Sequence, residues 1–425
     1  MNESTVIAPV ITVVGVPEDG CMSLTSRAIN AVSQARVLAG HTRLLQWFPQ
    51  FNGRRLTMEQ GYQSWFNQVI DESEEGDVVV LASGDPLFYG IGNALIKHLE
   101  PQSLRFIPSL SSMQLAFARL AEPWADARCI SLHGRVLRGL VARLQQGDLF
   151  TVLTDSLNTP VTIARHLLAF GETSWQVSVC EQLGAAGETV RQFDVSQLAG
   201  MNNDDFDPLN VVVLKRLQHR FWGGMGQYAD DEAFEKRMPQ RGLITKQPIR
   251  HLALAALKLR PTDTVWDIGT GSGSIAIESA KQCWQGKVFT VECNEACYSA
   301  IEANFITHAT DNVTLVKGKA PEAMAKLPPP DAVFVGGSRG AIDTILAIAW
   351  QQLKPGGVLI ATAVTLDSVA AIYQWSKQHS LDPKVQLASI SHGVPLAQYT
   401  RYQADNPIHL FIFEKPLLIE KPVIQ

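Results

Sequence analysis

The chain has 425 residues, enough for two or three domains, and 46% of them are hydrophobic and 18% charged, as in an ordinary globular protein. A formal net charge of −5 argues against a general nucleic-acid-binding protein, because such proteins gain affinity by neutralising phosphates. No apolar run reaches the roughly 20 residues of a membrane span, and residues 1–16 lack the basic start of a secretory signal. We therefore expect a cytoplasmic protein with no membrane partner, and its six cysteines, which include no CxxC pair, predict free thiols rather than a metal site.

Short apolar runs rich in β-branched residues alternate with helical patterns in the first half of the chain. The runs lie at 10–16, 78–83, 104–109 and 129–134, and the helical patterns at 23–35, 91–98 and 112–119. This alternation predicts a mostly parallel sheet with crossover helices. A second set of runs, at 149–155, 175–183, 189–195 and 210–216, predicts a second α/β lobe of the same unit.

The pattern breaks between about 217 and 245, where a Gly-rich stretch is followed by a charge-dense one. We place a domain boundary there, with domains at 1–218 and 219–425. A solvated linker without chemistry is the plain interpretation of this stretch.

After the linker the alternation of strands and helices restarts. Strands are expected at 264–268, 287–292, 313–317, 331–335 and 357–363, and helices at 247–257, 274–281, 294–308 and 341–353. The last two strands, at 385–391 and 408–414, have no helical pattern between them. They predict an antiparallel pair at the end of an otherwise parallel, Rossmann-like sheet, which is more specific than an α/β fold alone.

A Gly-rich loop follows the first strand of this second half. Asp267, Gly269, Gly271 and Gly273 lie between that strand and a helix, and Glu292 ends the next strand. Glycines let the backbone approach a ligand, and the helix start offers unpaired N–H groups. The spacing G-x-G-x-G differs from the dinucleotide fingerprint G-x-G-x-x-G, and the acid before it would repel a pyrophosphate. S-adenosylmethionine instead carries a sulfonium and an ammonium, which Asp267 can attract, while Glu292 suits a ribose diol. Glycines used only for tight packing are the alternative.

The second half resembles the class I methyltransferases that use S-adenosylmethionine, over about 240–415. By analogy, the backbone at Gly318 and Ala320 approaches the adenine. Many such enzymes have an acid after that glycine, and this chain has Lys319 instead.

Three turns in the first half lie at the ends of consecutive expected strands. Their sequences are GVPEDG at 15–20, SGDPLFYG at 83–90 and PSLSS at 108–112. Each alone is ordinary turn chemistry. Together they predict one ligand site, because open α/β sheets bind ligands at the carboxyl ends of their strands.

These motifs resemble the tetrapyrrole methylase family, the class III S-adenosylmethionine methyltransferases, over about 10–216. That family has two α/β lobes with the cofactor in the cleft between them. Gly84 and Asp85 match its GDP motif, and Ser111 and Ser112 match its next loop; we add Pro17 and Phe88 from the same turns as candidate cofactor residues. The family's commoner first loop is G-x-G-P-G, and the form GVPEDG, with SLHGR at 131–135 and DPLNVVVL at 207–214, resembles the branch that acts late in the corrin pathway.

The fusion of the two halves resembles the family of bifunctional, decarboxylating precorrin-6Y methyltransferases of cobalamin biosynthesis. The resemblance implies two S-adenosylmethionine sites per chain and no metal. It assigns methylation of C5 to the first domain, and methylation of C15 with loss of the C12 acetate carboxylate, giving precorrin-8, to the second.

An anionic tetrapyrrole needs local cations in a net negative protein. Our candidates are His133, Arg135, Lys246, Arg250 and Arg339, of which Lys246 and Arg250 are spaced for one helix face. Each is also compatible with a solvated surface charge, and His133 with a structural histidine. We find no Ser/His/Asp triad and name no catalytic base.

Two other functions remain open: a methyltransferase acting on another tetrapyrrole, RNA or protein, and a nicotinamide-dependent oxidoreductase. The acidic balance disfavours RNA. The relatives suggest a homo-oligomer. The sequence leaves open whether the substrate already carries cobalt and in which order the two carbons are methylated.

Overall fold

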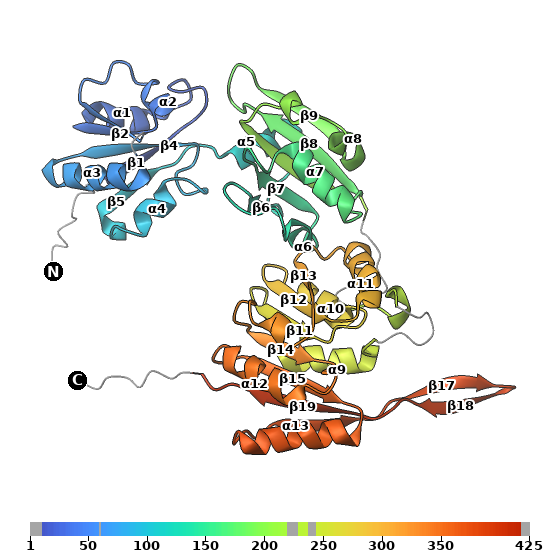
Figure 1. Cartoon of the computed structure of the whole chain (residues 1–425). Coiled ribbons are helices and arrows are strands. Elements are labelled where there is room, and N and C mark those ends of the chain that lie inside the picture. The colour runs from blue at the N-terminus through green and yellow to red at the C-terminus, as the bar shows by residue number, and fades with distance from the viewer. Residues whose placement is uncertain (1–10, 59–60, 219–227, 237–243, 418–425) are drawn as a thin grey trace, which may run out of the picture. The chain divides into compact units, whose positions relative to one another are not determined.

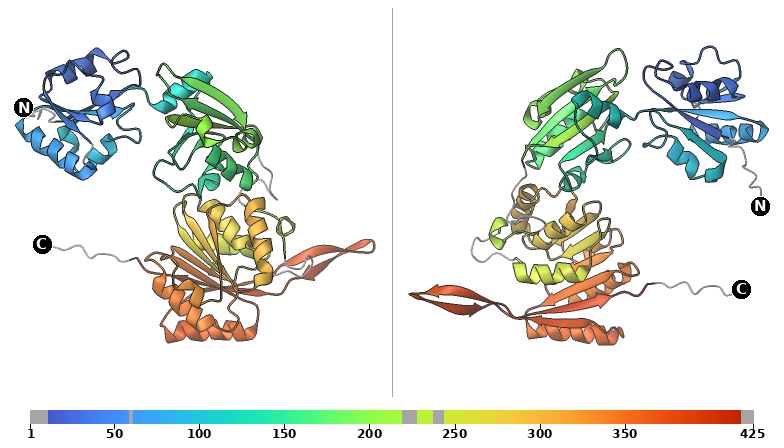
Figure 2. Two further views of the ribbon diagram at one scale, coloured as in Figure 1. Left: turned by 45° about the horizontal axis from the view of Figure 1, so that its top comes forward. Right: turned by 180° about the vertical axis from the view of Figure 1, so that it is seen from behind.

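The computed structural model describes residues 11–58, 61–218, 228–236 and 244–417 (Figures 1 and 2). Contacts divide the chain into two compact units. Unit 1 comprises Met1–Arg135, Gly147–Arg165 and Trp175–Leu217, and unit 2 comprises Val136–Gln146, His166–Ser174 and Gln218–Gln425. The chain passes into unit 2 for the last time close to the predicted linker, and the two short earlier segments also pack with unit 2.

The first sheet of unit 1 is fully parallel. Its strands run in the order β3-β2-β4-β1-β5: β1 (Ile11–Val16), β2 (Val37–Gly40), β3 (Arg54–Thr57), β4 (Val78–Ser83) and β5 (Leu104–Ile107). Helices α1 (Ser26–Gln34) and α2 (Thr42–Leu45) pack on one face and α3 (Tyr62–Glu75) on the other. Because both faces are covered, β1 and β4 are apolar along their length rather than alternating. Helix α4 (Gly92–Ile96) follows the loop after β4.

The second sheet of unit 1 is mixed. Its strands run in the order β6-β7-β10-β8-β9: β6 (Arg128–Ser131), β7 (Leu149–Leu153), β8 (Trp175–Glu181), β9 (Thr189–Asp194) and β10 (Asn210–Arg216). Only β6 and β7 pair in parallel. The apolar run at 129–134, which we grouped with the first sheet, belongs here as β6. Helix α5 (Ser112–Leu120) buries Met113 and Phe117 against this sheet, and the other helices of the region are α6 (Leu140–Leu144), α7 (Pro160–Ala169) and α8 (Val195–Ala199).

The sheet of unit 2 has seven strands in the order β13-β12-β11-β14-β15-β19-β16. They are β11 (Thr264–Ile268), β12 (Lys287–Glu292), β13 (Val313–Lys317), β14 (Ala332–Val335), β15 (Val358–Ala363), β16 (Lys384–Ala388) and β19 (Ile408–Glu414). The first five in that order are parallel, and β19 is antiparallel to both β15 and β16. The predicted antiparallel pair at the end of a parallel sheet is confirmed.

Helices cover both faces of this sheet. One face holds α9 (Gln247–Leu257), α10 (Ser274–Gln282) and α11 (Glu295–Thr307), and the other holds α12 (Ile342–Gln352) and α13 (Leu366–Gln378). Short 3₁₀ helices lie at Pro101–Ser103, Asn203–Asp205, Asp231–Ala233 and Glu322–Met324. Helices on both faces explain why the central strands β14 and β15 are almost wholly apolar.

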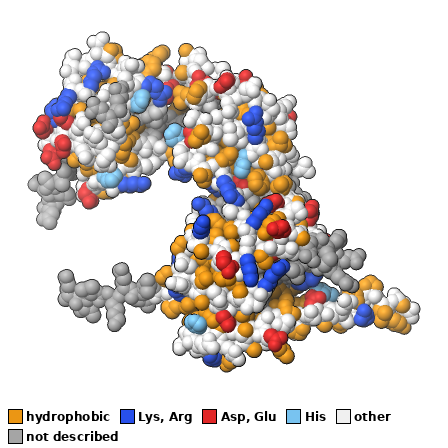
Figure 3. Space-filling model, viewed as in Figure 1, with side chains coloured by type: hydrophobic (Ala, Val, Ile, Leu, Met, Phe, Trp, Pro, Cys, Tyr) orange, Lys and Arg blue, Asp and Glu red, His pale blue; other side chains and the backbone are white. Residues whose placement is uncertain are grey.

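A two-stranded hairpin that the sequence patterns did not predict joins β16 to β19. It consists of β17 (Ser391–Leu396) and β18 (Tyr399–Ala404). Leu396, Tyr399 and Tyr402 are 53%, 68% and 82% exposed, and Figure 3 shows hydrophobic side chains along this hairpin. Within the described ranges, no helix is long and apolar enough to cross a membrane.

Asp311 of unit 2 explains why the segment around α6 belongs to this unit. Its fully buried carboxylate accepts hydrogen bonds from the backbone N–H groups of Gly139, Val141 and Ala142 at the start of α6, at 2.8 to 3.0 Å. His166 Nε2 lies 2.8 Å from the same carboxylate. This one carboxylate thus accepts the otherwise unpaired N–H groups at the start of α6 and also holds the segment around His166 beside it.

Candidate active sites

Three loops meet at the carboxyl ends of neighbouring strands of the first sheet. β1 lies between β4 and β5, and the loops that follow these strands carry Pro17, Gly84 and Ser111. Gly15 marks how tightly the loops pack, because a Cβ there would lie 2.2 Å from Gly84 O and 2.7 Å from Ser109 N. Gly84 itself has φ +59°, a conformation that favours glycine. The glycines of these motifs therefore let three backbones approach one another beside a cavity.

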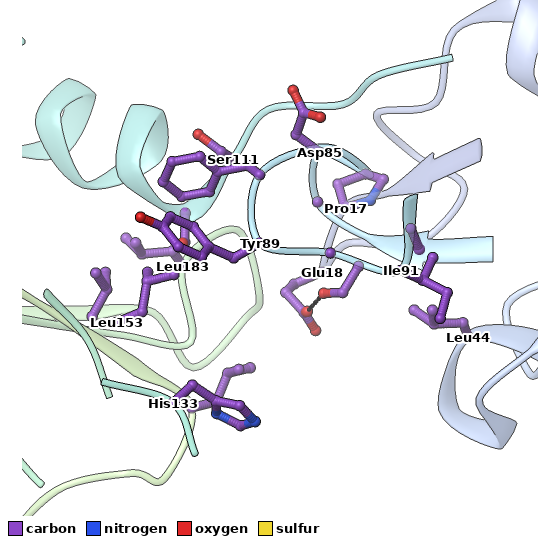
Figure 4. Close-up of a pocket in the computed structure, with 18 of the residues that line it drawn as sticks. Pro17, Glu18, Leu44, Asp85, Tyr89, Ile91, Ser111, His133, Leu153 and Leu183 are labelled. Carbon is purple, nitrogen blue, oxygen red and sulfur yellow. Dashed lines mark hydrogen bonds between the residues drawn. The ribbon is translucent and has the colours of Figure 1, made fainter. Parts of the chain in front are cut away.

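A cavity of about 820 Å³ opens at this edge and is lined by residues of both sheets of unit 1 (Figure 4). All eight candidate residues of the first half line it: Pro17, Gly84, Asp85, Phe88, Ser111, Ser112, His133 and Arg135. The three turns and the SLHGR segment thus line one cavity, and that this cavity is the ligand site stays a prediction. Their separate roles in binding stay predictions.

Two of these side chains also support the loops. Ser111 caps α5, where its hydroxyl accepts a hydrogen bond from Gln114 N, and the Gln114 side chain accepts one from Ser111 N. Asp85 Oδ1 accepts a hydrogen bond from Leu87 N at 2.8 Å. These bonds fix the backbones of two loops that line the cavity.

The loop that carries His133 and Arg135 is anchored from behind. Asn158 Nδ2 donates to Leu132 O and to Arg135 O, both at 2.9 Å, and Gly134 N donates to Asp155 Oδ2 at 2.7 Å. Burial alone would raise the pKa of Asp155, but hydrogen bonds from Asn158, Gly134 and Leu157 outweigh it and lower that pKa. The two basic side chains are thus presented on a fixed backbone.

Our candidates did not include Glu18, Arg43 and Tyr89, which also line this cavity. Glu18 pairs with Arg43 at 2.8 Å and accepts a hydrogen bond from Ser83 Oγ at 3.0 Å, so that it joins the ends of β1, β2 and β4. Tyr89 lines the same cavity. Glu18 and Tyr89 both lie inside motifs we had singled out, but a sequence pattern does not tell which side chains of a turn face a cavity.

A second cavity, of about 360 Å³, lies in unit 2. It is lined by the loops after β11, β12, β13 and β14, and seven of our candidates line it: Lys246, Gly269, Gly271, Glu292, Gly318, Ala320 and Arg339. Gly269 has φ +77°, and a Cβ there would lie 2.6 Å from Gly337 O. The absence of a side chain at Gly269 is what lets the loops after β11 and β14 touch.

Glu292 connects the Gly-rich loop to the next strand. Its carboxylate accepts hydrogen bonds from Gly271 N at 3.0 Å, Cys293 N at 3.0 Å and Asn294 N at 2.8 Å. A carboxylate has about four lone-pair sites, so Glu292, which lines the cavity, keeps acceptor capacity beyond these three bonds.

Asp267 and Gly273 lie outside the cavity lining, unlike our expectation for these two residues. Asp267 is 1% exposed, and its carboxylate accepts hydrogen bonds from the Thr270 and Thr290 hydroxyls behind the loop. Burial raises its pKa to about 6, the two threonines act to lower it, and the charge of Glu292 raises it. Gly273 begins α10 with φ +82°. Both residues shape the loop without lining the cavity, and their role toward a ligand stays a prediction.

Arg250 was a wrong choice of substrate cation. Its side chain is fully buried and pairs with Glu278 at 3.0 Å and with Asp231, and it donates to Ala229 O and Thr245 O. Lys246, at the start of α9, does reach the cavity lining, as do Lys319 and Arg339. Lys246 and Arg250 are four residues apart, which suggested a common helix face, but only Lys246 lines the cavity.

Family models match both halves of the chain. A model of tetrapyrrole (corrin/porphyrin) methylases matches residues 10–199, and a model of precorrin methyltransferase domains matches residues 235–415. The precorrin-6Y C(5,15)-methyltransferase [decarboxylating] of Sinorhizobium sp is 34% identical over 380 residues, which are 87% of this chain and 88% of that protein.

The chain belongs to the precorrin-6Y C5,15-methyltransferase (decarboxylating) family.

As a member of this family, the chain is an S-adenosylmethionine-dependent methyltransferase of cobalamin biosynthesis. Two shorter relatives each correspond to part of it. The cobalt-precorrin-7 C(5)-methyltransferase of Salmonella typhimurium is 33% identical and covers 48% of this chain and 98% of its own length. A probable cobalt-precorrin-6B C(15)-methyltransferase (decarboxylating) of Pyrobaculum calidifontis is 33% identical and covers 42% of this chain and 92% of its own length.

The residues that line the second cavity of this family member are chemically compatible with S-adenosylmethionine. Gly269 and Gly271 line it without side chains, Glu292 offers a carboxylate, and the volume lies in the range of small-molecule sites. The larger first cavity has room for more than one small molecule. Within the described part of the chain, no group of three or more His, Cys, Asp or Glu residues is arranged to hold a metal ion.

Proposed function

We propose that this chain methylates C5 and C15 of precorrin-6Y, or of its cobalt form, and removes the carboxylate of the C12 acetate, giving precorrin-8. We further propose one donor site in each of two catalytic domains, 1–218 and 219–425, without a metal cofactor. The observation that carries the proposal is the presence of two separate cavities in one chain, each at the carboxyl ends of parallel strands. Relatives of half its length that are named for one reaction each support the division.

The N-terminal domain is assigned the methylation of C5. When bound, S-adenosylmethionine supplies a methyl group on an electrophilic sulfonium. The loops carrying Pro17, Gly84, Asp85, Phe88, Ser111 and Ser112 would hold it, with backbone groups and the Asp85 carboxylate as polar contacts. The chain's contribution is then to hold the donor in line with a carbon of the tetrapyrrole and to exclude water.

The C-terminal domain is assigned the methylation of C15 and the decarboxylation. Gly269, Gly271, Gly318 and Ala320 would let the backbone approach the donor, and Glu292 would accept from its ribose hydroxyls. Asp267 and Gly273 would act from behind by fixing the loop.

Cations in both linings suit a substrate with several carboxylates. His133 and Arg135 line the first cavity, and Lys246 and Arg339 the second. Decarboxylation needs an electron sink, which a conjugated tetrapyrrole can provide itself. The protein then has to orient the ring through its other carboxylates and to desolvate the departing one, for which Ile249, Ile268 and Ile345 supply apolar surface.

Mass spectrometry of the product tests the proposal. Precorrin-6Y and S-adenosylmethionine are incubated with the full chain, and the product is compared with the substrate. We expect a gain of two methyl groups and the loss of one CO2. Transfer of a single methyl group, or two without loss of CO2, would contradict the assignment of both reactions to this chain.

Self-association of the chain remains a prediction. The β17–β18 hairpin exposes Leu396, Tyr399 and Tyr402, side chains of the kind that protein interfaces use. Analytical ultracentrifugation of the full chain measures the oligomeric state, and a monomer at micromolar concentration would refute the prediction.

A further inference from the structure

We propose that Tyr89 positions Arg135 and forms a wall of the tetrapyrrole site in the first cavity, so that the pair recognises a carboxylate side chain of the ring. The proposal rests on the function proposed above and names the two residues that would orient the substrate for the first domain. Arg135 would touch the substrate, and Tyr89 would act largely through Arg135.

The backbone of Tyr89 is held in an unusual conformation. Its φ is +55°, in the left-handed region that non-glycine residues rarely adopt. It follows a turn in which Phe88 N donates to Asp85 O at 3.1 Å, and the Phe88 side chain packs against the apolar cluster of the second sheet. Strain of this kind persists where surrounding contacts fix it, and it is concentrated at functional sites.

That conformation sends the tyrosine ring from a loop of the first sheet to the edge of the second. The Tyr89 hydroxyl donates to Cys129 O, on β6, at 3.4 Å. The ring packs edge-on against Phe88, with centroids 5.3 Å apart, and is 46% exposed although it lines the cavity (Figure 4). A flat and partly exposed aromatic surface inside a cavity suits a conjugated ring system.

Arg135 lies over this ring, with its guanidinium carbon 5.8 Å from the ring centroid. Cation–π attraction of this kind holds a guanidinium without using its N–H groups. Its own backbone is fixed, because Arg135 N donates to Leu132 O at 3.0 Å and Asn158 Nδ2 donates to Arg135 O at 2.9 Å. The backbone hydrogen bonds fix the position of Arg135, and the contact with Tyr89 fixes the direction of its side chain.

The charges around the two arginines of the lining differ. Arg43 is paired with Glu18 at 2.8 Å. For Arg135, no carboxylate of the described residues lies within ion-pair distance. A planar guanidinium with five N–H donors, resting on an aromatic face, is well suited to bind a carboxylate from a ligand in the cavity. Of the two arginines, Arg135 is therefore the one that can form an ion pair with a carboxylate of the substrate.

The tetrapyrrole is the occupant that the geometry favours, because the ring and the cation together match a conjugated ligand with carboxylate side chains. The methionine carboxylate of the methyl donor is the competing occupant. A binding experiment with S-adenosylhomocysteine distinguishes the two occupants, because this molecule carries the amino-acid carboxylate of the methyl donor but lacks the tetrapyrrole ring system.

The test uses the full chain with Tyr89→Leu, Tyr89→Phe, Arg135→Gln and the Tyr89→Leu/Arg135→Gln double variant. The KM for precorrin-6Y and the kcat of C5 methylation are measured with a ¹³C-methyl donor, and S-adenosylhomocysteine affinity by calorimetry. Tyr373→Leu is the matched control, since Tyr373 is 51% exposed with Lys377 at 5.3 Å from its ring and lines neither cavity.

We expect Tyr89→Leu and Arg135→Gln each to raise the KM about tenfold, with kcat changed less than about threefold, in line with the strength of a cation–π pair and a charged hydrogen bond. Tyr89→Phe keeps the ring and should restore the KM to within about twofold. The double variant should match Arg135→Gln, because both changes remove one interaction. Tyr373→Leu should leave the KM unchanged.

Three results would overturn the proposal while the wild-type reaction still proceeds: an unchanged KM in Tyr89→Leu, additive effects in the double variant, or a parallel fall in S-adenosylhomocysteine affinity, which would assign the pair to the donor. Failure of the wild-type chain to methylate C5 would instead reject the proposed function.

Discussion

Two carboxylates on neighbouring strands of unit 2, Asp267 on β11 and Glu292 at the end of β12, differ in what surrounds them. Glu292 accepts hydrogen bonds from three backbone N–H groups and lines the cavity, while Asp267 is buried and accepts hydrogen bonds from two side-chain hydroxyls and one backbone N–H. Charge on Glu292 is thus well compensated, whereas charge on Asp267 is disfavoured by burial. The sequence pattern assigned both to the ligand, because it cannot show which of two nearby acids faces inward.

Asp267 should make the stability of the protein depend on pH. Its pKa is about 6 in the folded chain and 3.8 ordinarily, so the folded state holds this proton more tightly. The stabilising contribution is fully present below about pH 4 and is lost as the pH rises through 6, by about 3 kcal/mol for a shift of this size. We expect the free energy of unfolding of wild type, relative to Asp267→Asn, to fall by that order between pH 4 and pH 7 in urea titrations.

Asp155 provides the control for this experiment, because its pKa is lowered in the folded chain. The difference between wild type and Asp155→Asn should therefore change in the opposite direction, with stability lost as the pH falls. A wild-type advantage over Asp267→Asn that is flat with pH would disprove the buried-acid assignment.

Gly269→Ala should disable the second site selectively. A Cβ at this position would lie 2.6 Å from Gly337 O, with φ at +77°, so the loops after β11 and β14 must separate. We expect C15 methylation and CO2 release to fall at least about tenfold, and C5 methylation on a suitable acceptor to persist, as product analysis by mass spectrometry would show. Gly61→Ala is the control, since Gly61 has φ +95° but nothing within 4 Å of the added Cβ. Equal losses in both variants would point to backbone strain alone.

At the scale of elements, α9 and α10 are joined by a buried ion pair. Arg250 on α9 and Glu278 on α10 are both fully buried, and Arg250 also contacts Asp231 and the carbonyl of Thr245 beside the cavity. Arg250 therefore acts in the framework that supports one rim of the second cavity. The same contacts explain why it is unavailable to a substrate.

Arg250→Met should destabilise the chain strongly. It leaves Glu278 and Asp231 without their buried cation, which costs about 3–5 kcal/mol. Lys246→Met removes a cation whose side chain is 51% exposed, and the expected loss is below about 1 kcal/mol. Urea unfolding of the two variants measures the difference, and similar losses would contradict the framework role of Arg250.

Elements with long apolar runs could be predicted from the sequence, and shorter ones could not. β1, β4, β11 and β12 were expected because parallel strands buried on both faces have few polar residues. β3 carries two arginines in four residues, and β17 contains a glycine and a proline, so neither shows a strand pattern. The run that became β6 was assigned to the wrong sheet, because strand pairing depends on contacts distant in sequence.

At the scale of the whole molecule, the candidate sites could be located because they depend on strand ends. Fifteen of our eighteen candidates line the two cavities, and Asp267, Gly273 and Arg250 do not. The motifs follow strands whose carboxyl ends share one edge, so their proximity follows from the fold class. Which side chains face inward depends on packing, and this is why Glu18, Arg43 and Tyr89 were found only in the structure.

The central claim is that one chain holds two independent sites for the same methyl donor. Calorimetric titration with S-adenosylhomocysteine tests it directly in wild type, Gly15→Ala and Gly269→Ala, since a Cβ at Gly15 would lie 2.2 Å from Gly84 O in the first site. We predict two molecules bound per wild-type chain and one per chain of either variant. One molecule per wild-type chain, or loss of both from a single glycine substitution, would contradict the account.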